Sequence, residues 1–136
     1  MRADAMTERA ILGRLKAFSD NFMIRDIDGM LSLFALEADV VMLGSEDWEM
    51  AAGHKNLRPL FKRLFSRKET TWWVWKLHSV SATGPVAWVL ATGEAHARAG
   101  KSETVPPYRL SAVFEKRGYG WLWMQFHGSE PFPAKE

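Results

Sequence analysis

The chain has 136 residues, of which 47% are apolar and 25% charged, with a formal net charge of +2. This is the composition of an ordinary globular domain, and it excludes an intrinsically disordered chain and a coiled coil. Cysteine is absent, which excludes disulfides and thiolate chemistry and favours a cytoplasmic location.

Two helices are predicted near the N-terminus. Four apolar residues at helical spacing predict a first amphipathic helix from Thr7 to near Arg25. Asp28 is expected to cap a short second helix over residues 29–35. The apolar residues of the first helix are Ile11, Leu15, Phe18 and Phe22.

A short hairpin and a third helix follow. Residues 39–43 are typical of a strand, and the turn residues 44–47 lead to a short return strand over 48–52. The third helix should begin near Asn56, because Pro59 fits best in a first helical turn. Its inward stripe is Leu57, Leu60, Phe61, Leu64 and Phe65.

The second half of the chain is predicted to be β-rich. Turn signals at 83–85 and 118–120 help to separate the segments. Helices followed by an antiparallel meander indicate an α+β fold. We expect one domain over residues 7–131, with an N-terminal extension over 1–6 and a C-terminal tail over 132–136. The four predicted strands are 70–81, 86–98, 108–116 and 121–129.

The last predicted strand has apolar residues on both faces, so we expect a sheet covered on both sides. Simple alternation places Gln125 and His127 on one face among aromatic residues, where polar groups need partners or a ligand. This pattern predicts the wall of a pocket. The residues of that face are Trp121, Trp123, Gln125 and His127.

Two stretches resemble a known superfamily. Residues 26–35, followed by Gly53, Leu57 and Arg58, resemble the nuclear-transport-factor-2-like superfamily, which includes ketosteroid isomerases and SnoaL-like proteins. The ending Trp121-Leu122-x-Met124-Gln125-Phe126-His127-x-Ser129 resembles the last strand of the calcium/calmodulin-dependent protein kinase II association domain. The resemblance implies a cone-shaped, curved antiparallel or mixed sheet wrapped around N-terminal helices. It also implies a conical cavity and dimerisation through the outer sheet face.

The resemblance counts against ketosteroid isomerisation. That reaction uses a tyrosine, a protonated aspartic acid and an aspartate base, and here these positions are occupied by Phe18, Ala112 and either Val41 or Met42. Two arginines of the kinase association domain align with Leu90 and Ala112. We therefore expect a cavity that is less cationic and more apolar than in the kinase domain.

Mapping the strands on this fold predicts the cavity lining. His127 is the first catalytic candidate, because an imidazole can exchange protons near neutral pH. Glu94 is the second, because it shares a strand face with His96. The alternative for both is a structural or solvated role. The predicted ligand-binding residues are Phe18, Trp88, Leu90, Thr92, Tyr108, Leu110, Ala112, Trp123, Gln125 and His127.

Other classes of partner are not expected. His54, His78, His96 and His127 lack a metal-binding spacing. No glycine-rich phosphate loop follows a strand, so no cofactor is expected. The basic third helix is more typical of a solvated face than of a nucleic-acid site. The longest apolar run, 86–91, is far shorter than the roughly 20 residues that span a bilayer, so no membrane partner is expected.

Three functions remain open from the sequence. The first is binding of a small, largely apolar molecule in an aromatic-lined cavity. The second is a SnoaL-like enzyme of the isomerase, cyclase or hydrolase type that uses His127. The third is an association module. A homodimer is expected in any case, because Trp72 and Val74 should lie on the outer sheet face.

Overall fold

The computed structural model describes residues 1–118 and 120–135. Tyr119, in the predicted turn, and Glu136, in the predicted tail, lie outside the described residues. The described helices are α1 (Ala5–Ile24), α2 (Ile27–Leu31) and α3 (Gly53–Phe65). The described strands are β1 (Val41–Leu43), β2 (Met50–Ala52), β3 (Thr70–Thr83), β4 (Val86–Ala99), β5 (Ser102–Thr104), β6 (Pro107–Arg117) and β7 (Gly120–Ser129).

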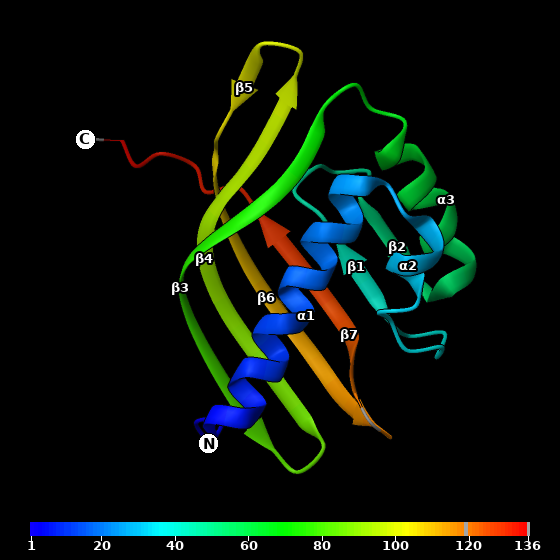
Figure 1. Cartoon of the computed structure of the whole chain (residues 1–136), viewed down its shortest axis with the longest axis vertical. Helices are drawn as coiled ribbons and strands as arrows, with labels where there is room; N and C mark the ends of the chain where they lie inside the picture. Colours follow the sequence, from blue (N-terminus) through cyan, green and yellow to red (C-terminus); the bar gives the residue numbers. More distant parts are fainter. Residues whose placement is uncertain (119, 136) are drawn as a thin grey trace.

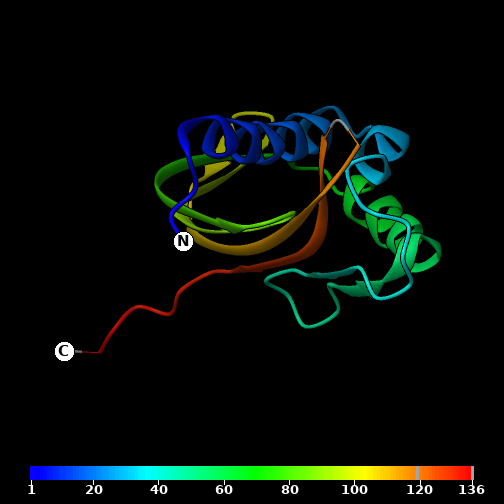
Figure 2. The ribbon, with the colours of Figure 1, turned by 90° about the horizontal axis from the view of Figure 1, so that it is seen from below.

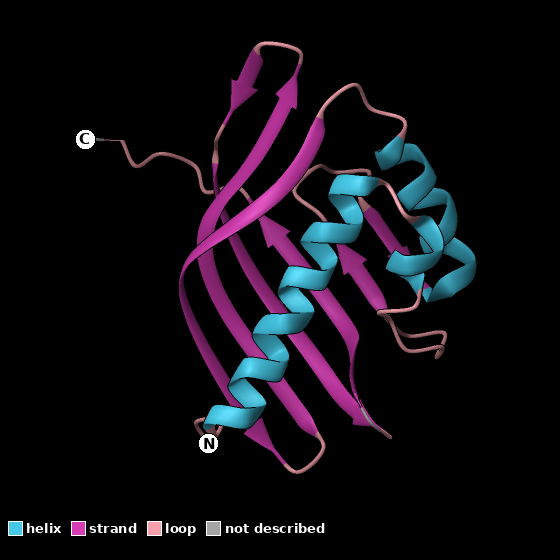
Figure 3. Cartoon of the chain, in the orientation of Figure 1, coloured by secondary structure: helices cyan, strands magenta, loops and turns pink. Residues whose placement is uncertain are grey.

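The described strands form one seven-stranded sheet with the order β2-β1-β7-β6-β4-β3, and β5 extends it beside β4 (Figure 1). Only β1 and β7 are parallel among these pairs, so the sheet is mixed. The helices gather on one side of it (Figure 3), and the sheet curves around α1 without closing (Figure 2). The predicted α+β fold with a curved sheet is confirmed.

Aspartates cap the first two helices. Asp4 caps α1, because its carboxylate accepts a hydrogen bond from the Thr7 amide at 2.8 Å. Asp26 caps α2 through the Gly29 amide at 2.9 Å, whereas Asp28 pairs with Arg58 at 2.9 Å. The predicted cap at Asp28 is therefore wrong. Two aspartates precede the same apolar segment, and the sequence pattern could not choose between them.

Residues 33–35 belong to the sheet and not to α2. The Trp123 amide donates to the Leu33 carbonyl at 2.8 Å, and the Ala35 amide donates to the Trp123 carbonyl at 3.1 Å. These bonds satisfy backbone groups that a longer helix would have used internally. The predicted helix over 29–35 is thus wrong in position, because pairing with β7 outweighs local helical spacing.

Helix α3 begins three residues earlier than predicted, at Gly53. Pro59 therefore lies in the second helical turn, where its missing N–H costs one internal hydrogen bond. The Gly53 amide donates to the Val40 carbonyl at 2.8 Å, and the Asn56 side-chain amide donates to the Ala52 carbonyl at 3.0 Å. These contacts stabilise the extra turn. In the described part of the chain, no helix is long and apolar enough to cross a membrane.

The four long strands are confirmed, each extended by one or more residues, whereas β1 and β2 are shorter than predicted. β5 was not predicted, because its three residues are all polar. The N-terminal extension adds to the sheet edge: the Ala3 amide donates to the Val80 carbonyl at 3.0 Å, and the Ala82 amide donates to the Met1 carbonyl at 2.8 Å.

A β-bulge in β7 decides which side chains enter the core. Trp123 pairs with Phe114 and Gln125 pairs with Val113, so Met124 is an extra residue between them. The bulge reverses the alternation. Phe126 therefore points inward and is buried, whereas Gln125 and His127 are exposed on the convex side, which we call the outer face. The prediction that Gln125 and His127 share a face with Trp123 is wrong.

Phe18 of α1 is the centre of the core. Its side chain is 3% exposed, and its ring stacks on Phe126 at 4.8 Å between centroids. Further ring contacts join it to Trp123 at 5.2 Å and Trp73 at 5.5 Å. These contacts hold α1 against the concave side of the sheet, and they fill the middle of the cone with aromatic rings.

Arg25 ties the end of α1 to the segment after α3. Its backbone is left-handed, with φ 61°, and it caps α1. Its guanidinium donates hydrogen bonds to the carbonyl oxygens of Phe65, of Arg67 at 2.8 Å and of Glu69 at 3.1 Å. Arg25 thus terminates α1 and also holds the segment that follows α3.

We expect Arg25→Ala to lower the free energy of unfolding by about 1–3 kcal/mol, because three carbonyls lose their donor. Arg25→Gly loses the same bonds but relaxes the left-handed backbone, so it should be about 1 kcal/mol more stable than Arg25→Ala. Urea denaturation of the three proteins measures both differences. Equal stability of Arg25→Ala and the wild type would contradict the assigned role.

Candidate functional site

A small cavity lies beside the aromatic core, at the end of the cone near β5. Its volume is about 150 Å³. It is enclosed by the turn after β1, by the C-terminal part of α3 and by the concave side of the sheet. Its lining includes Phe22, Met42, Glu49, Leu64, Arg67, Thr71, Trp73, Tyr108, Phe126 and Glu130.

Glu49 is the buried acid of this cavity, with 8% of its surface exposed. It follows a tight turn in which the Gly44 amide donates to the Glu49 carbonyl at 2.7 Å. The Glu49 carboxyl folds back over Gly44, where a Cβ atom would overlap it. Only glycine at position 44 leaves this space, so the turn sequence itself directs the acid into the cavity.

Glu49 shares one cation, Arg67, with a second carboxylate, Glu46. Arg67 pairs with Glu46 and lies 3.7 Å from the Glu49 carboxyl. Burial, followed by the hydrogen bond and the charge of Glu46, raises the pKa of Glu49 to about 7 against the opposing charge of Arg67. For Glu46, partial burial is outweighed by hydrogen bonds with Glu49 and Arg67, so its pKa is lowered. Glu49 is thus the member of the pair that keeps a proton.

Tyr108 supplies a second proton donor. Its ring packs on Trp73 at 5.8 Å and on Trp75 at 6.2 Å, and its hydroxyl lies over Gly128, where a Cβ would overlap it. Burial raises the pKa of Tyr108, and the charges of Glu49 and Glu130 add to this effect. The hydroxyl therefore stays protonated and can donate a hydrogen bond.

Trp73 adds an unused donor to the wall. Its backbone amide donates to the Ser19 hydroxyl at 2.9 Å, which fixes the residue against α1. Its indole Nε1 is buried and has no hydrogen-bond partner among the described residues. Buried donors are normally paired, so this N–H is an exception in the core next to the cavity.

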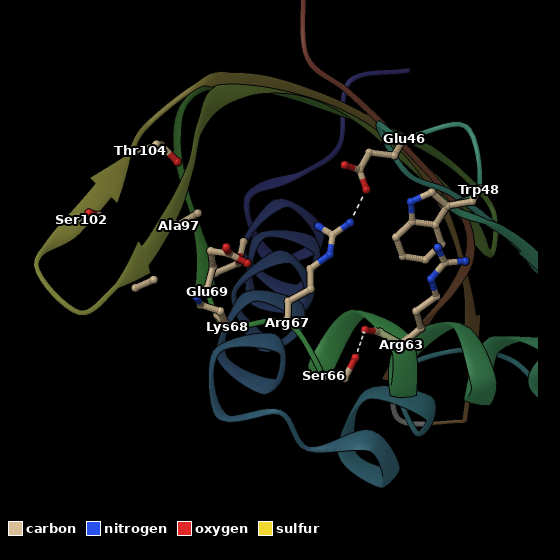
Figure 4. Close-up of a pocket in the computed structure, with 12 residues that line it drawn as sticks. Glu46, Trp48, Arg63, Ser66, Arg67, Lys68, Glu69, Ala97, Ser102 and Thr104 are labelled. Atoms are coloured by element: carbon tan, nitrogen blue, oxygen red, sulfur yellow. Dashed lines mark hydrogen bonds and ion pairs between the residues drawn. The ribbon is translucent and has the colours of Figure 1, made fainter.

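A wider pocket of about 900 Å³, which we call the mouth, adjoins the cavity; Figure 4 shows the residues that line it. The Arg63 guanidinium lies 3.7 Å from the centre of the Trp48 ring, a close cation–π contact. Arg67 points toward Glu46 (Figure 4), and Lys68 follows it along the rim. The mouth is polar and partly cationic, in contrast to the aromatic cavity behind it.

Five predicted ligand-binding residues lie on the concave side. Tyr108 lines the cavity, whereas the other four are buried in the core beside it. The interior is therefore more completely filled than predicted, because the aromatic rings around Phe18 pack against one another. The four core residues are Phe18, Leu110, Ala112 and Trp123.

The remaining predicted cavity residues lie on the outer face, and their predicted positions are wrong. In β4 the small residues Ala87 and Ala91 point inward beneath α1, so their bulky neighbours point outward. Pairing with Val113 and Ser111 fixes this register. The bulge in β7 has the same effect. The misplaced residues are Trp88, Leu90, Thr92, Gln125 and His127.

Glu94 and His96 also lie on the outer face, away from the cavity. The Glu94 carboxylate is 3.7 Å from Lys76 and 3.4 Å from His96. His96 also contacts Glu103 at 3.2 Å and stacks on the Trp72 ring. This cluster fixes the sheet edge and has no contact with the cavity, so the predicted placement of Glu94 beside it is wrong.

Sequence reasoning missed Glu46, Glu49 and Arg67. Two carboxylates three residues apart in a turn gave the only local signal. Their burial depends on Gly44 and on α3, which no periodicity reveals. Within the described ranges, no group of three histidine, aspartate or glutamate side chains could hold a metal ion.

Solved structures share this α+β cone. A protein of the NTF2-like family from Streptomyces avermitilis, for which a dehydratase activity has been suggested, has a TM-score of 0.85 and 16% identity, over 96% of this chain and 100% of that one. A suggested aromatic ring hydroxylase from Novosphingobium aromaticivorans has a TM-score of 0.84 and 17% identity, over 97% and 94%. A suggested calcium/calmodulin-dependent protein kinase II association domain from Xanthomonas campestris has 0.77 and 17%, over 95% and 89%.

The family model of the SnoaL-like domain matches residues 11–134. The chain therefore belongs to the SnoaL-like family, and the predicted resemblance is confirmed. The curated proteins give no significant match. The structural relatives are too distant in sequence to show more than the fold.

Glu49 predicts a distinct pH dependence of stability. Its pKa is raised from 4.5 to about 7 on folding, so the unfolded chain releases this proton first as the pH rises. The free energy of unfolding should therefore fall between pH 4.5 and 7, by on the order of 2 kcal/mol. Glu49→Gln should remove this fall, whereas Glu94→Gln, on the outer face, should keep it. Urea titrations across this pH range measure the effect, and an unchanged profile in Glu49→Gln would contradict it.

Proposed function

We propose that the chain binds a small, largely apolar molecule in the cavity, with Glu49 and Tyr108 donating hydrogen bonds to an oxygen of that molecule. The observation that carries the proposal is the buried Glu49 carboxyl, whose pKa is about 7 and which lines the same cavity as Tyr108. Strongly shifted acids in concave sites cluster at functional positions. A carbonyl or hydroxyl oxygen would satisfy both donors.

The surrounding walls support an apolar ligand body. Phe22, Trp73 and Phe126 offer aromatic surface, and Met42 and Leu64 add aliphatic surface. Small-molecule sites are commonly apolar with a few polar groups that fix orientation.

A second candidate is proton-transfer catalysis at the same site. A carboxyl with a pKa of about 7 can give or accept a proton at neutral pH, and Tyr108 could stabilise a developing oxyanion. A dehydratase activity has been suggested for the Streptomyces avermitilis protein, which has the same fold. Glu49 replaces His127 as the proposed acid–base residue, because His127 lies on the outer face.

We expect phenol, as a one-ring hydroxyl probe, to shift the NMR signal of the Trp73 indole N–H on binding. Tyr108→Phe should weaken phenol binding by up to about tenfold, since one hydrogen bond is worth about 1 kcal/mol. His127→Ala is the matched control and should leave binding unchanged. Weaker binding in His127→Ala but not in Tyr108→Phe would overturn the proposal. Turnover of any co-purified molecule that is lost in Glu49→Gln would support the second candidate.

The outer face also supports self-association, as a property separate from the cavity. Leu77 and Leu90 are 72% and 61% exposed, and they lie on neighbouring strands in one shallow apolar groove. Exposed apolar side chains grouped on a flat sheet commonly lie at interfaces. We propose that this face pairs two copies of the chain.

Sedimentation of the wild-type protein at micromolar concentration should then give a dimer. Leu90→Glu should shift it to a monomer, because two buried carboxylates would face each other near the two-fold axis. Leu36→Glu is the matched control, since Leu36 is 79% exposed and lies outside the sheet. A wild-type monomer, or equal effects of both variants, would exclude this interface.

A further inference from the structure

The cavity limits the ligand to about one ring. An apolar cavity of 150 Å³ holds a molecule the size of benzene, and this cavity has the same volume. Its aromatic walls, Phe22, Trp73 and Phe126, suit the face and edge of a planar ring. A fused multi-ring body exceeds this space. The remainder of any larger ligand must therefore extend into the mouth.

The cavity and the mouth lie side by side. The lining residues common to both are Arg67, Thr71, Ala97 and Thr104. A ligand whose ring lies in the cavity would reach the rim with a substituent that passes Arg67, which borders both spaces and is drawn in Figure 4. The chemistry of the rim decides which substituent is favoured.

The rim favours a single negative charge. Its described lining holds three cations, Arg63, Arg67 and Lys68, against two carboxylates, Glu46 and Glu69. Arg67 is already paired with Glu46. Arg63 and Lys68 have no ion-pair partner in the part of the chain that the structure describes.

Arg63 has the features of a prepared anion site. The helix dipole stabilises cations in the last turn of a helix, and both Lys62 and Arg63 lie in the last turn of α3. Of these two, Arg63 lines the mouth, and its guanidinium lies 3.7 Å from the centre of the Trp48 ring, closer than that of Arg67 at 5.2 Å. A fixed planar guanidinium suits a carboxylate, because it can donate two parallel hydrogen bonds with little further loss of entropy.

We infer that the ligand of the proposed site is a monocyclic carboxylic acid, whose ring fills the cavity and whose carboxylate lies at the mouth against Arg63 and Lys68. This inference rests on the proposed function. It adds a charge requirement that the cavity alone does not impose. The ring substituent that meets Glu49 and Tyr108 is an oxygen, as in a hydroxyphenyl acid.

Calorimetric titration with 4-hydroxyphenylacetate and with its neutral amide, 4-hydroxyphenylacetamide, tests the inference. The two probes share the ring and the hydroxyl and differ in charge. We expect the acid to bind at least tenfold more tightly to the wild-type protein. Arg63→Gln should remove that advantage and leave amide binding unchanged, which also shows that the variant is folded. Lys62→Gln, with the same charge change on the same helix but outside the mouth, should behave as the wild type.

Each other outcome decides the matter. Equal binding of acid and amide overturns the carboxylate assignment and leaves the proposed cavity intact. If Arg63→Gln and Lys62→Gln weaken acid binding equally, the assignment to Arg63 is overturned, because the acid then responds only to the net positive charge of the helix. Tighter binding of phenyl phosphate than of the acid overturns it in favour of a phosphate ligand. If neither probe binds while phenol still does, the inference fails alone, and if phenol also fails, the proposed function fails.

Discussion

The burial of Phe18 among aromatic rings is the contact on which this structure depends. It holds α1 in the concave side of the sheet through Phe126, Trp123 and Trp73. Rings packed this closely leave no space in the middle of the cone. The free volume is therefore confined to one end, where α3 and the turn after β1 complete the wall. The position of the cavity is a consequence of how the core is filled.

The raised pKa values of the acidic groups in the cavity follow from their burial. Glu49 is buried away from water, and Arg67 pairs more closely with Glu46 than with Glu49. A neutral carboxyl is the form that costs least to bury under these conditions. Tyr108 lies in the same environment and also keeps its proton. The site thus presents proton donors to its interior and cations to its rim.

The sequence was sufficient for the fold and insufficient for the site. Long runs of β-branched and aromatic residues predicted the four long strands, the order of elements predicted an α+β fold, and the family resemblance implied the cone. The predicted side-chain faces were wrong in two places. In β7 they were wrong after Met124, where one inserted residue reverses the alternation. In β4 they were wrong because the inward row is mostly alanine. Glu49 could not be predicted, because its burial depends on a turn folding onto Gly44 and on a helix distant in sequence.

The site draws its parts from two sources with different constraints. Its walls are core residues of the sheet, and any change there disturbs packing around Phe18. Its acid comes from the short turn between β1 and β2, which is held by its own backbone bonds. Such a turn can change in sequence with little cost to the rest of the domain. The polar groups of this cavity and the shape of its walls can therefore diverge independently, which is one way in which a single fold can host several functions.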